Sequence, residues 1–414
     1  MTAVSLSESV FSLPCLLAED LECPELNLLD ELAEGARVLA VGESAHFVRE
    51  LGMVRRQLTR YFVERRGFTH VALELGQLQA EQLEPWLLGE RPESDFEDCA
   101  GELTRALYGP FLRWLRNYNL EHGASVRLLG PDLPNTLTLS AELDAVLSSL
   151  KTLDPASLRL LREARQTASR IDGASAAVSA LQWTTIPRPE RDLLCSSLSQ
   201  LALRFEVLEG LLIQQGGEAS FLRARQLLET ARYTEQMLRA MSELFEGGGL
   251  EAATSIRDCF AARTLSRALT DEPGRRVLLL AHNNHIQKEP VCFAGELSAL
   301  PMGKYLAEQW GHQYRALALT HLGQQVPEML FPQPESSLGF GVGLVELPEA
   351  ETGSVEHALL SAAVSPGPLF LRLGSDSQWP ELTKIRSQSG QVEARLDRAF
   401  DGVLAVSQAS MEND

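Results

Sequence analysis

The stretch Arg37-Val-Leu-Ala-Val-Gly-Glu-Ser-Ala-His46 decides the fold, because an apolar run passes within a few residues into a polar cluster. Four further runs resemble its first half: residues 70–75, 126–130, 276–281 and 314–320 are mostly apolar and rich in Val, Leu and Ala. Strands that face solvent on one side alternate apolar and polar residues, whereas near-continuous apolar runs are typical of strands covered on both faces. The sequence therefore predicts a mostly parallel central sheet.

Helical patterns lie between these runs. In residues 50–66 the apolar side chains Leu51, Val54, Leu58 and Phe62 recur every three or four positions, and residues 111–120 and 302–310 are similar. Strands that alternate with helices indicate βαβ units. We therefore expect an α/β fold in which helices flank a mostly parallel central sheet. Further strands are expected near 342–345 and 368–373, and the last eight residues are expected to fray.

Residues 139–272 have long helical patterns and hardly any strand pattern, most clearly at 193–212 and 221–245. We interpret them as a helical insertion subdomain that forms a substrate wall or lid. The first part of the α/β core would then span residues 1–138, and its second part with the C-terminal segment would span 273–414. The alternative is a helical bundle that only supports the core.

Composition excludes several classes of protein. The net charge of −19 over 414 residues repels phosphate backbones and anionic membranes, so we expect neither a nucleic-acid nor a membrane partner. The N-terminus has no basic segment and is a poor signal peptide, and no apolar run is long enough to span a membrane. The six cysteines form no C-x-x-C pair and are expected to be reduced thiols in a cytoplasmic protein.

Polar side chains follow several of the predicted strands. Glu43 and His46 follow the first strand, Glu74 lies near the end of the second, Asp132 follows the third, and His282 and His285 follow the fourth. Each has a simpler explanation when taken alone, such as a helix cap, a buried salt bridge or a capped loop. Ligands of parallel sheets bind at the carboxyl ends of the strands. The repeated placement therefore favours one site on one rim of the sheet.

Glu43 and His46 are three residues apart, so one turn of helix would put them on the same side. A carboxylate beside an imidazole can fix its tautomer and raise its basicity, which suits a general base. The spacing also matches the ligands of di-iron bundles, but those need two such motifs and the sequence has one. It also lacks H-E-x-x-H, G-x-S-x-G, a P-loop and G-x-G-x-x-G, so we expect no metal and no cofactor.

Taken together, these motifs resemble the erythromycin esterase family. The hallmark segment after the first strand is Gly42-Glu43-Ser44-Ala45-His46-Phe47-Val48-Arg49-Glu50. The other matches, in family order, are Val71-Ala-Leu-Glu74, Trp114-Leu-Arg-Asn-Tyr-Asn119, Gly130-Pro-Asp132, Arg257-Asp258, Ala281-His-Asn-Asn-His285, Met302-Gly-Lys-Tyr-Leu306 and Gly311-His-Gln-Tyr314. Each motif is short, but the ordered set from about residue 36 to 320 is specific.

The resemblance and the chemistry together imply hydrolysis of a lactone or ester in a small molecule, such as a macrolide-like natural product. His46 would be the general base, oriented by Glu43. His285 and Arg257 would stabilise the oxyanion, and Glu74 would hold the water or a neighbouring cation. Phe47, Arg49, Asp132 and His282 are expected to bind substrate. The roles of Arg257 and Glu74 rest mainly on the resemblance.

The sequence also departs from the family pattern. Phe47 replaces the glycine that usually follows the motif histidine, and Phe260-Ala-Ala-Arg263 stands where the family tends to have Met-Ala-x-Asn. The substrate could therefore differ from a macrolide. One alternative is a natural-product tailoring enzyme that uses the same site for cyclisation, dehydration or acyl transfer. Another is a non-catalytic binder that kept the fold. The sequence does not indicate an oligomeric state.

Overall fold

The structure is a computed structural model that describes residues 9–18, 24–123, 125–134, 139–248, 252–293, 296–333, 335–362, 367–373, 379 and 381–412. Its centre is an eight-stranded sheet in the order β1-β11-β14-β8-β2-β5-β3-β4. The strands from β14 to β4 are parallel to their neighbours, whereas β1 and β11 pair antiparallel at the other edge. The predicted fold class is confirmed.

The five apolar runs that were predicted as strands lie in the parallel part of this sheet. They are β2 (Val38–Val41), β3 (His70–Leu73), β4 (Arg127–Leu129), β5 (Val277–Leu280) and β8 (Tyr314–His321). Every residue of β2, β3 and β5 is buried, as expected of strands covered on both faces. The remaining strands of the sheet are β1 (Val10–Ser12), β11 (Leu369–Arg372) and β14 (Gly402–Val406).

Two hydrophobic cores form on the two faces of the sheet because successive strand residues point to opposite sides. Leu39 and Val41 belong to one core and Val38 and Ala40 to the other. The first core packs against α1 (Asp30–Ala33), α2 (Arg49–Arg66), α3 (Gln77–Leu87), α4 (Phe96–Cys99) and α5 (Glu102–Glu121). The second packs against α11 (Ser255–Asp271), α12 (Asn283–Ile286), α13 (Met302–Trp310), α14 (Val355–Ser361) and α15 (Leu396–Ala399).

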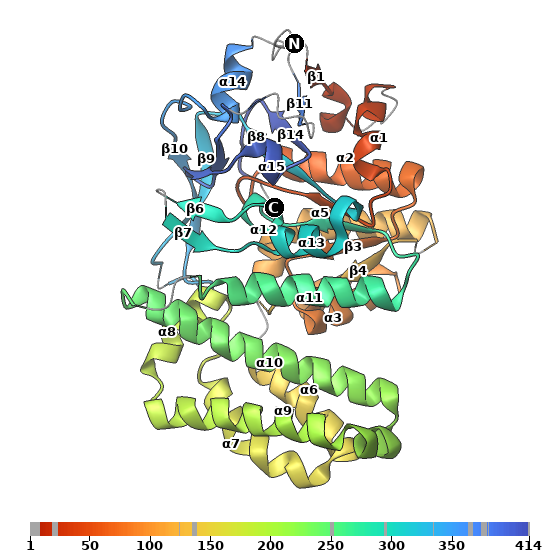
Figure 1. Cartoon of the computed structure of the whole chain (residues 1–414), viewed down its shortest axis with the longest axis vertical. Coiled ribbons are helices and arrows are strands. Elements are labelled where there is room, and N and C mark those ends of the chain that lie inside the picture. Colours follow the sequence, from red (N-terminus) through yellow and green to blue (C-terminus); the bar gives the residue numbers. More distant parts are fainter. Residues whose placement is uncertain are drawn as a thin grey trace.

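A separate helical part follows β4 in the chain and lies at one end of the molecule (Figure 1). It contains α6 (Leu139–Leu153), α7 (Leu158–Ser169), α8 (Ala176–Thr185), α9 (Arg188–Gly216) and α10 (Glu218–Phe245), which share a hydrophobic core of their own. The next helix, α11, packs on the sheet through Ala261, Leu265 and Leu269 instead. The helical core therefore ends before α11, and the domain limits 138 and 272 stay a prediction.

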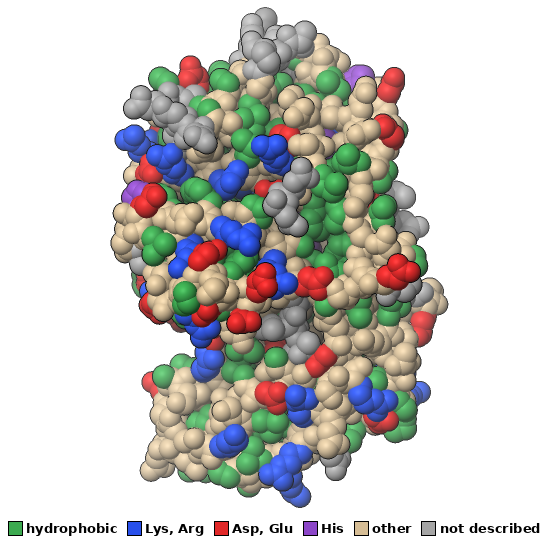
Figure 2. Space-filling model, turned by 180° about the vertical axis from the view of Figure 1, so that it is seen from behind, with side chains coloured by type: hydrophobic (Ala, Val, Ile, Leu, Met, Phe, Trp, Pro, Cys, Tyr) green, Lys and Arg blue, Asp and Glu red, His purple; other side chains and the backbone are tan. Residues whose placement is uncertain are grey.

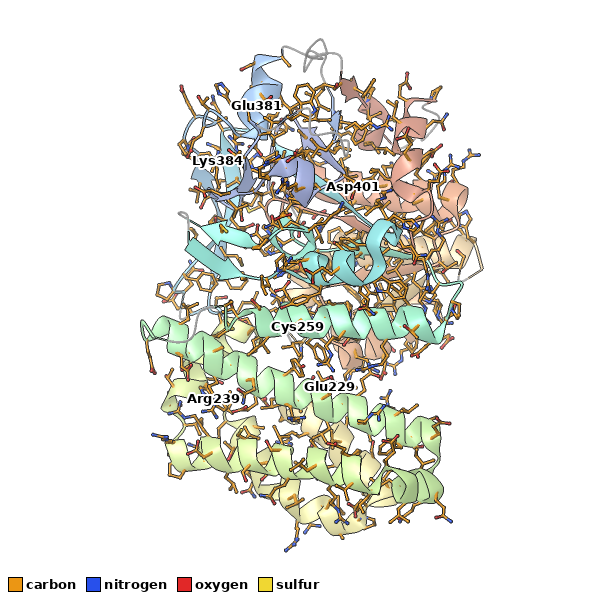
Figure 3. All side chains as sticks on the ribbon, viewed as in Figure 1. Glu229, Arg239, Cys259, Glu381, Lys384 and Asp401 are labelled. Carbon is orange, nitrogen blue, oxygen red and sulfur yellow. The ribbon has the colours of Figure 1, made fainter. Side chains whose placement is uncertain are left out.

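Ion pairs join the helical part to the rest of the protein. Glu229 of α10 bonds Arg263 and Arg267 of α11, at 3.4 and 2.9 Å, and it is labelled on α10 in Figure 3. Arg223 of α10 bonds Glu81 of α3 at 2.6 Å. Figure 2 shows the surface indented between the two parts, with acidic and basic side chains interspersed across this face. Among the described helices, none combines the length and apolar character that crossing a membrane requires.

The C-terminal third adds two small sheets. One is the hairpin of β9 (Gln325–Leu330) and β10 (Gly341–Glu346), and the other has the order β12-β13-β6-β7, with β12 (Lys384–Ser387), β13 (Gly390–Glu393), β6 (Val291–Phe293) and β7 (Glu296–Ala299). Short 3-10 helices span Pro14–Leu17, Pro24–Leu29, Glu93–Asp95, Pro155–Ser157 and Gly311–Gln313.

Two sequence expectations were wrong. The last eight residues do not fray as a whole, because buried Glu50 accepts hydrogen bonds from Gln408 and from the backbone and hydroxyl of Ser410, and Met411 bridges to Val48. Residues 413 and 414 lie outside the described residues. In addition, Cys15 is disulfide-bonded rather than a reduced thiol. The free cysteines of the described residues are Cys99, Cys195, Cys259 and Cys292.

Candidate active site

The carboxyl ends of three neighbouring strands deliver the predicted side chains to one rim. Glu43 follows β2, His285 follows β5 and Glu74 follows β3, and these strands lie side by side. One side-chain ligand atom from each of Glu43, His46 and Glu74 lies within 4.8 Å of the others. Nε2 of His285 is 3.4 Å from Oε1 of Glu74. The four side chains therefore form one cluster at the end of the sheet.

Glu43 lies between two groups that favour its ionised form. Its Oε1 is 2.8 Å from Nδ1 of His46, and its Oε2 is 2.7 Å from Nη1 of Arg55. Burial raises the pKa of Glu43, but Arg55 and His46 outweigh burial and lower it. Burial lowers the pKa of His46, but the hydrogen bond and charge of Glu43 outweigh burial and raise it. An ionised Glu43 therefore faces the Nδ1 of His46.

The spacing predicted that one turn of helix brings Glu43 and His46 together. In the structure an irregular loop makes this contact instead. Helix α2 begins only at Arg49, and residues 44–47 form bends and turns. The backbone N–H of His46 donates to Oε1 of Gln388 at 2.9 Å. This long-range hydrogen bond fixes the turn that carries the imidazole.

Arg55 of α2 joins the ends of two strands beneath this pair. Its guanidinium donates to the carbonyl oxygens of Gly42 and Ala281 at 3.0 and 2.6 Å, besides its ion pair with Glu43. The side chain is only 6% exposed. A buried arginine needs such partners, because an unpaired charge in the interior is costly.

Glu74 lies at the centre of the second half of the cluster. The hydroxyl of Tyr108 in α5 donates to its Oε2 at 3.3 Å, and Nη2 of Arg257 is 3.5 Å from its Oε1. Burial raises the pKa of Glu74, but the positive charges of His285 and Arg257 outweigh burial and hold that pKa at about 2. Glu74 is therefore a buried carboxylate that stays ionised at every physiological pH.

His285 is held by a second carboxylate. Its Nδ1 is 2.8 Å from Oδ1 of Asp258 in α11, and Asp258 also accepts a hydrogen bond from the backbone of Met302. Burial lowers the pKa of His285, but the carboxylates of Asp258 and Glu74 raise it to about 8. His285 is thus an imidazolium at neutral pH, with one nitrogen on Asp258 and the other directed to Glu74.

Arg257 and Asp132 form a bidentate ion pair next to Glu74. Nε and Nη2 of Arg257 donate to the two oxygens of Asp132, at 2.9 and 2.5 Å. Oδ1 of Asp132 also accepts the backbone N–H of Leu133 at 2.7 Å. Such fork-to-fork pairs fix the plane of the guanidinium. Asp132 therefore orients Arg257 from a position that is itself 4% exposed.

His282 and Arg49 were both predicted to bind substrate, but they lie in different environments: His282 is buried and Arg49 is exposed. Nε2 of His282 is 3.0 Å from the carbonyl of Ser44, and its Nδ1 accepts the backbone N–H of Asn284. Burial and the neighbouring His46 and His285 lower the pKa of His282 to about 3, so it is neutral. Arg49 is exposed at the start of α2. These contacts tie His282 to the backbone of the His46 turn.

Comparisons with known proteins identify the family of this chain. The family model described as erythromycin esterase matches residues 63–409. The chain belongs to the erythromycin esterase family. It is 35% identical to erythromycin esterase type I of Escherichia coli, over 96% of this chain and 97% of that protein, and 29% identical to the type II enzyme, over 92% of each.

Two solved structures have the same fold. A mutant of the erythromycin esterase EreC in its open conformation superposes with a TM-score of 0.93 at 36% identity and covers 98% of both chains. A succinoglycan biosynthesis protein has a TM-score of 0.72 at 15% identity, over 98% of this chain and 96% of that one. The second likeness shows the fold alone, whereas family membership makes this chain a hydrolase of the esterase class.

The departure from the family pattern at Phe47 carries a backbone cost. Phe47 has a φ of +62°, in the left-handed region that costs residues with a Cβ about 1–2 kcal/mol. Glycine adopts this conformation without strain, which accounts for the glycine usual at this position. The Phe47 ring is 9% exposed and packs with Leu103, Leu338 and Phe340. This chain therefore combines backbone strain with apolar packing beside His46.

Sequence reasoning missed three members of the cluster: Arg55, Tyr108 and Asp258. Arg55 had a usable signal, because it lies on the apolar side of α2 between Val54 and Leu58, where a charged residue needs a buried partner. Tyr108 lies on the apolar side of α5, four residues before Leu112, where a tyrosine is indistinguishable from a core residue. Asp258 adjoins Arg257 in the recognised motif, but nothing in the sequence ties it to His285.

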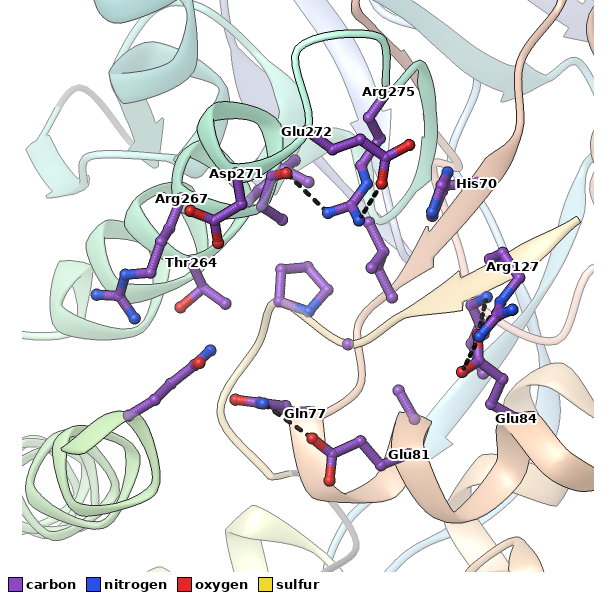
Figure 4. Close-up of a pocket in the computed structure, with 18 residues that line it drawn as sticks. His70, Gln77, Glu81, Glu84, Arg127, Thr264, Arg267, Asp271, Glu272 and Arg275 are labelled. Carbon is purple, nitrogen blue, oxygen red and sulfur yellow. Dashed lines mark hydrogen bonds and ion pairs between the residues drawn. The ribbon is translucent and has the colours of Figure 1, made fainter. Parts of the chain in front are cut away.

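Small cavities adjoin the cluster on two sides. One of about 30 Å³ is lined by Glu43, Phe47, Arg55 and Tyr108, and one of about 10 Å³ by Glu74, Arg257 and His285. A much larger cavity, of about 620 Å³, lies between α3, α10 and α11 (Figure 4). None of the predicted site residues, all of which the structure describes, lines the large cavity. His70 lines it from the start of β3, whereas Glu74 follows the end of that strand.

Proposed function

We propose that this protein hydrolyses the lactone of a macrolide-like small molecule with His46 as general base and without a metal. The observation that carries the proposal is the 2.8 Å contact between Glu43 and Nδ1 of His46. Because ionised Glu43 accepts the Nδ1 proton, the lone pair of neutral His46 is on Nε2. That nitrogen takes a proton from the attacking water, a step typically worth 10²–10⁴-fold in rate.

Glu74 and His285 act on the other partners of the reaction. With a pKa of about 2, Glu74 remains a carboxylate, which can accept a hydrogen bond from the attacking water and orient it. The Nε2 of imidazolium His285 is 3.4 Å from Glu74, which is long for a charge-assisted hydrogen bond. A substrate carbonyl oxygen can compete for this donor, and the positive charge then stabilises the developing oxyanion.

Arg257 has a positioning role in this scheme. Asp132 takes up its Nε and Nη2, so Arg257 supplies fixed positive charge next to Glu74 rather than a mobile donor. Asp132 positions Arg257, and Asp258 positions His285, by accepting hydrogen bonds from them. Tyr108 donates to Glu74 and limits which of its oxygens meets the water.

The donors around Glu43, His46 and Glu74 argue for chemistry without a metal. These residue types bind zinc and iron, and their side-chain atoms are close enough together to share an ion. However, the two oxygens of Glu43 already have His46 and Arg55 as partners. Arg257 adds a second positive charge 3.5 Å from Oε1 of Glu74. The cations of the chain thus occupy the electrostatic role of a metal.

Product analysis tests the proposed function directly. The purified full-length chain is incubated with erythromycin, and the products are followed by mass spectrometry. Hydrolysis predicts a single product that is heavier by one water, with its lactone carbonyl converted to a carboxylate. A product of unchanged mass, or one lighter by a water, would favour cyclisation or dehydration by the same residues.

A further inference from the structure

We infer that the β9–β10 hairpin forms an apolar wall that binds the hydrocarbon face of a macrocyclic lactone while His46 acts on its ester. This inference rests on the proposed function and adds residues that recognise the substrate. We define the wall as Phe47, Met329, Phe331, Phe340 and Val342. Phe47 is the member that belongs to a recognised motif, and the other four were not indicated by any motif.

A continuous row of aromatic rings joins the catalytic turn to the surface of the hairpin. The ring centroid of Phe47 is 6.2 Å from that of His46 and 6.4 Å from that of Phe340. The ring of Phe340 is in turn 5.2 Å from that of Phe331. Aromatic pairs at these spacings are in contact. Along this row, burial falls from Phe340, which is 4% exposed, to Phe331, which is 55% exposed.

The hairpin presents one apolar side to this row. Met329 and Val342 are directly opposite each other in the antiparallel ladder, so their side chains share a face. Both pack against the small cluster of Phe47, Leu338 and Phe340. Phe331, directly after β9, is 55% exposed. Leu344, two residues after Val342 and therefore on the same side of β10, is 50% exposed. Exposed apolar side chains gathered on one face are typical of a binding site.

Gln388 fixes this hairpin relative to the catalytic turn. Its Oε1 accepts the backbone N–H of His46, and its Nε2 donates to Oε1 of Glu328 on β9 at 3.0 Å. The other oxygen of Glu328 accepts the backbone N–H of Ser389. The hairpin therefore has a defined distance to His46 and does not depend on Phe47 alone for its position.

The far end of the hairpin is attached to the helical part. The hydroxyl of Ser175, which caps α8, donates to the carbonyl of Leu338 at 2.8 Å. Leu338 itself is buried against Leu103 of α5. Through Leu338, which is not itself a member, the wall is connected to the helical part. Its continuity with His46 identifies the occupant as the substrate of that residue, and its apolar character requires a broad hydrocarbon face.

Equilibrium binding to the catalytically disabled His46→Asn protein tests the wall without interference from turnover. Erythromycin is titrated into this protein and into the same protein that also carries Phe331→Ser. Because Phe331 is half-exposed, its replacement should leave the fold intact. We expect Phe331→Ser to raise the Kd about ten-fold, as for truncation of an aromatic anchor. Phe331→Leu should restore most of the lost affinity. Leu360→Ser, at an equally exposed leucine of α14, is the control and should leave the Kd unchanged.

The possible outcomes distinguish an error in the proposed wall from an error in the proposed reaction. An unchanged Kd in Phe331→Ser, or the same loss in Leu360→Ser, would overturn the wall even if the unsubstituted chain hydrolyses erythromycin. Conversely, a ten-fold loss confined to Phe331→Ser supports the wall even if product analysis shows another reaction. Absence of any binding to His46→Asn would also overturn the wall, because its occupant would not be a macrolactone.

Discussion

Gln388 accepts a hydrogen bond from the backbone of His46, which lies 342 residues earlier in the chain, at 2.9 Å. Gln388 is in the turn between β12 and β13 and has a φ of +52°. Its own backbone N–H donates to the carbonyl of Ser44. The small C-terminal sheet therefore reaches back to hold the residue that we propose as general base.

Replacement of Gln388 by glycine separates positioning from stability. Glycine removes the side-chain hydrogen bonds, each worth about 1 kcal/mol, but it also relieves the positive φ, which is worth about the same. We expect the free energy of unfolding in urea to change little, while kcat falls roughly ten- to hundred-fold through misplacement of His46. Unchanged kcat in Gln388→Gly would show that the turn does not need this contact.

Phe47 gives a test of the backbone strain. At most buried positions alanine is more stable than glycine, but at a φ of +62° the Cβ of alanine is strained. We therefore expect Phe47→Gly to be more stable than Phe47→Ala by about 1 kcal/mol, although both lose the packing of the ring. Urea unfolding of the two variants measures this difference. The usual order, with alanine above glycine, would contradict the assigned conformation.

The pH profile of kcat/KM should be bell-shaped. His46 must be neutral to act as a base, and its pKa is raised above the ordinary 6.5. Activity should therefore increase as the pH rises and His46 loses its proton. His285 must be protonated, and its pKa is about 8, so activity should fall as pH rises through about 8. The optimum therefore lies between these two ionisations.

Asp258→Asn tests the assignment of the alkaline limb. The carboxylate of Asp258 is the main group that raises the pKa of His285, so its loss should move the falling limb below pH 8 and leave the acid limb in place. The same ionisation affects stability: a raised histidine pKa stabilises the fold below the unfolded value of about 6.5, and this contribution is lost as pH rises through about 8. An alkaline limb that does not move would exclude His285 as its origin.

Removal of metal ions should leave activity unchanged. Both oxygens of Glu43 have cationic or proton-donating partners within the chain, so the cluster is electrostatically satisfied by its own residues. Dialysis against a chelator, followed by assay in metal-free buffer, measures the requirement. Loss of turnover that zinc or iron restores would show that Glu43, His46 and Glu74 hold an ion.

The parts of the fold that could be predicted from the sequence are those with a local signal. Strands such as β2 and β5 are buried on both faces, and their apolar runs report this directly. The strand-end positions of Glu43 and His285 followed from the parallel sheet. Contacts such as Asp258 with His285, or Gln388 with His46, join distant segments, and no local pattern specifies them.

The prediction that the C-terminal tail frays was wrong for the same reason. Residues 408–412 look like a polar terminus, yet Ser410 and Gln408 satisfy buried Glu50, and the backbone of Glu412 donates to the carbonyl of Phe47. Burial also raises the pKa of the Glu412 carboxyl, to about 7. Their order depends on an acceptor more than 350 positions earlier, which only the folded chain brings near.

The role of His46 as general base is tested by the turnover of His46→Asn on erythromycin, measured beside its Kd for the same compound. Asparagine is similar in size and polarity but cannot take a proton at neutral pH. We expect kcat to fall roughly 10²–10⁴-fold while the Kd changes little, because the loss is confined to the transition state. A His46→Asn protein that retains full turnover would show that His46 is not the general base, whatever the rest of the chain shares with the family.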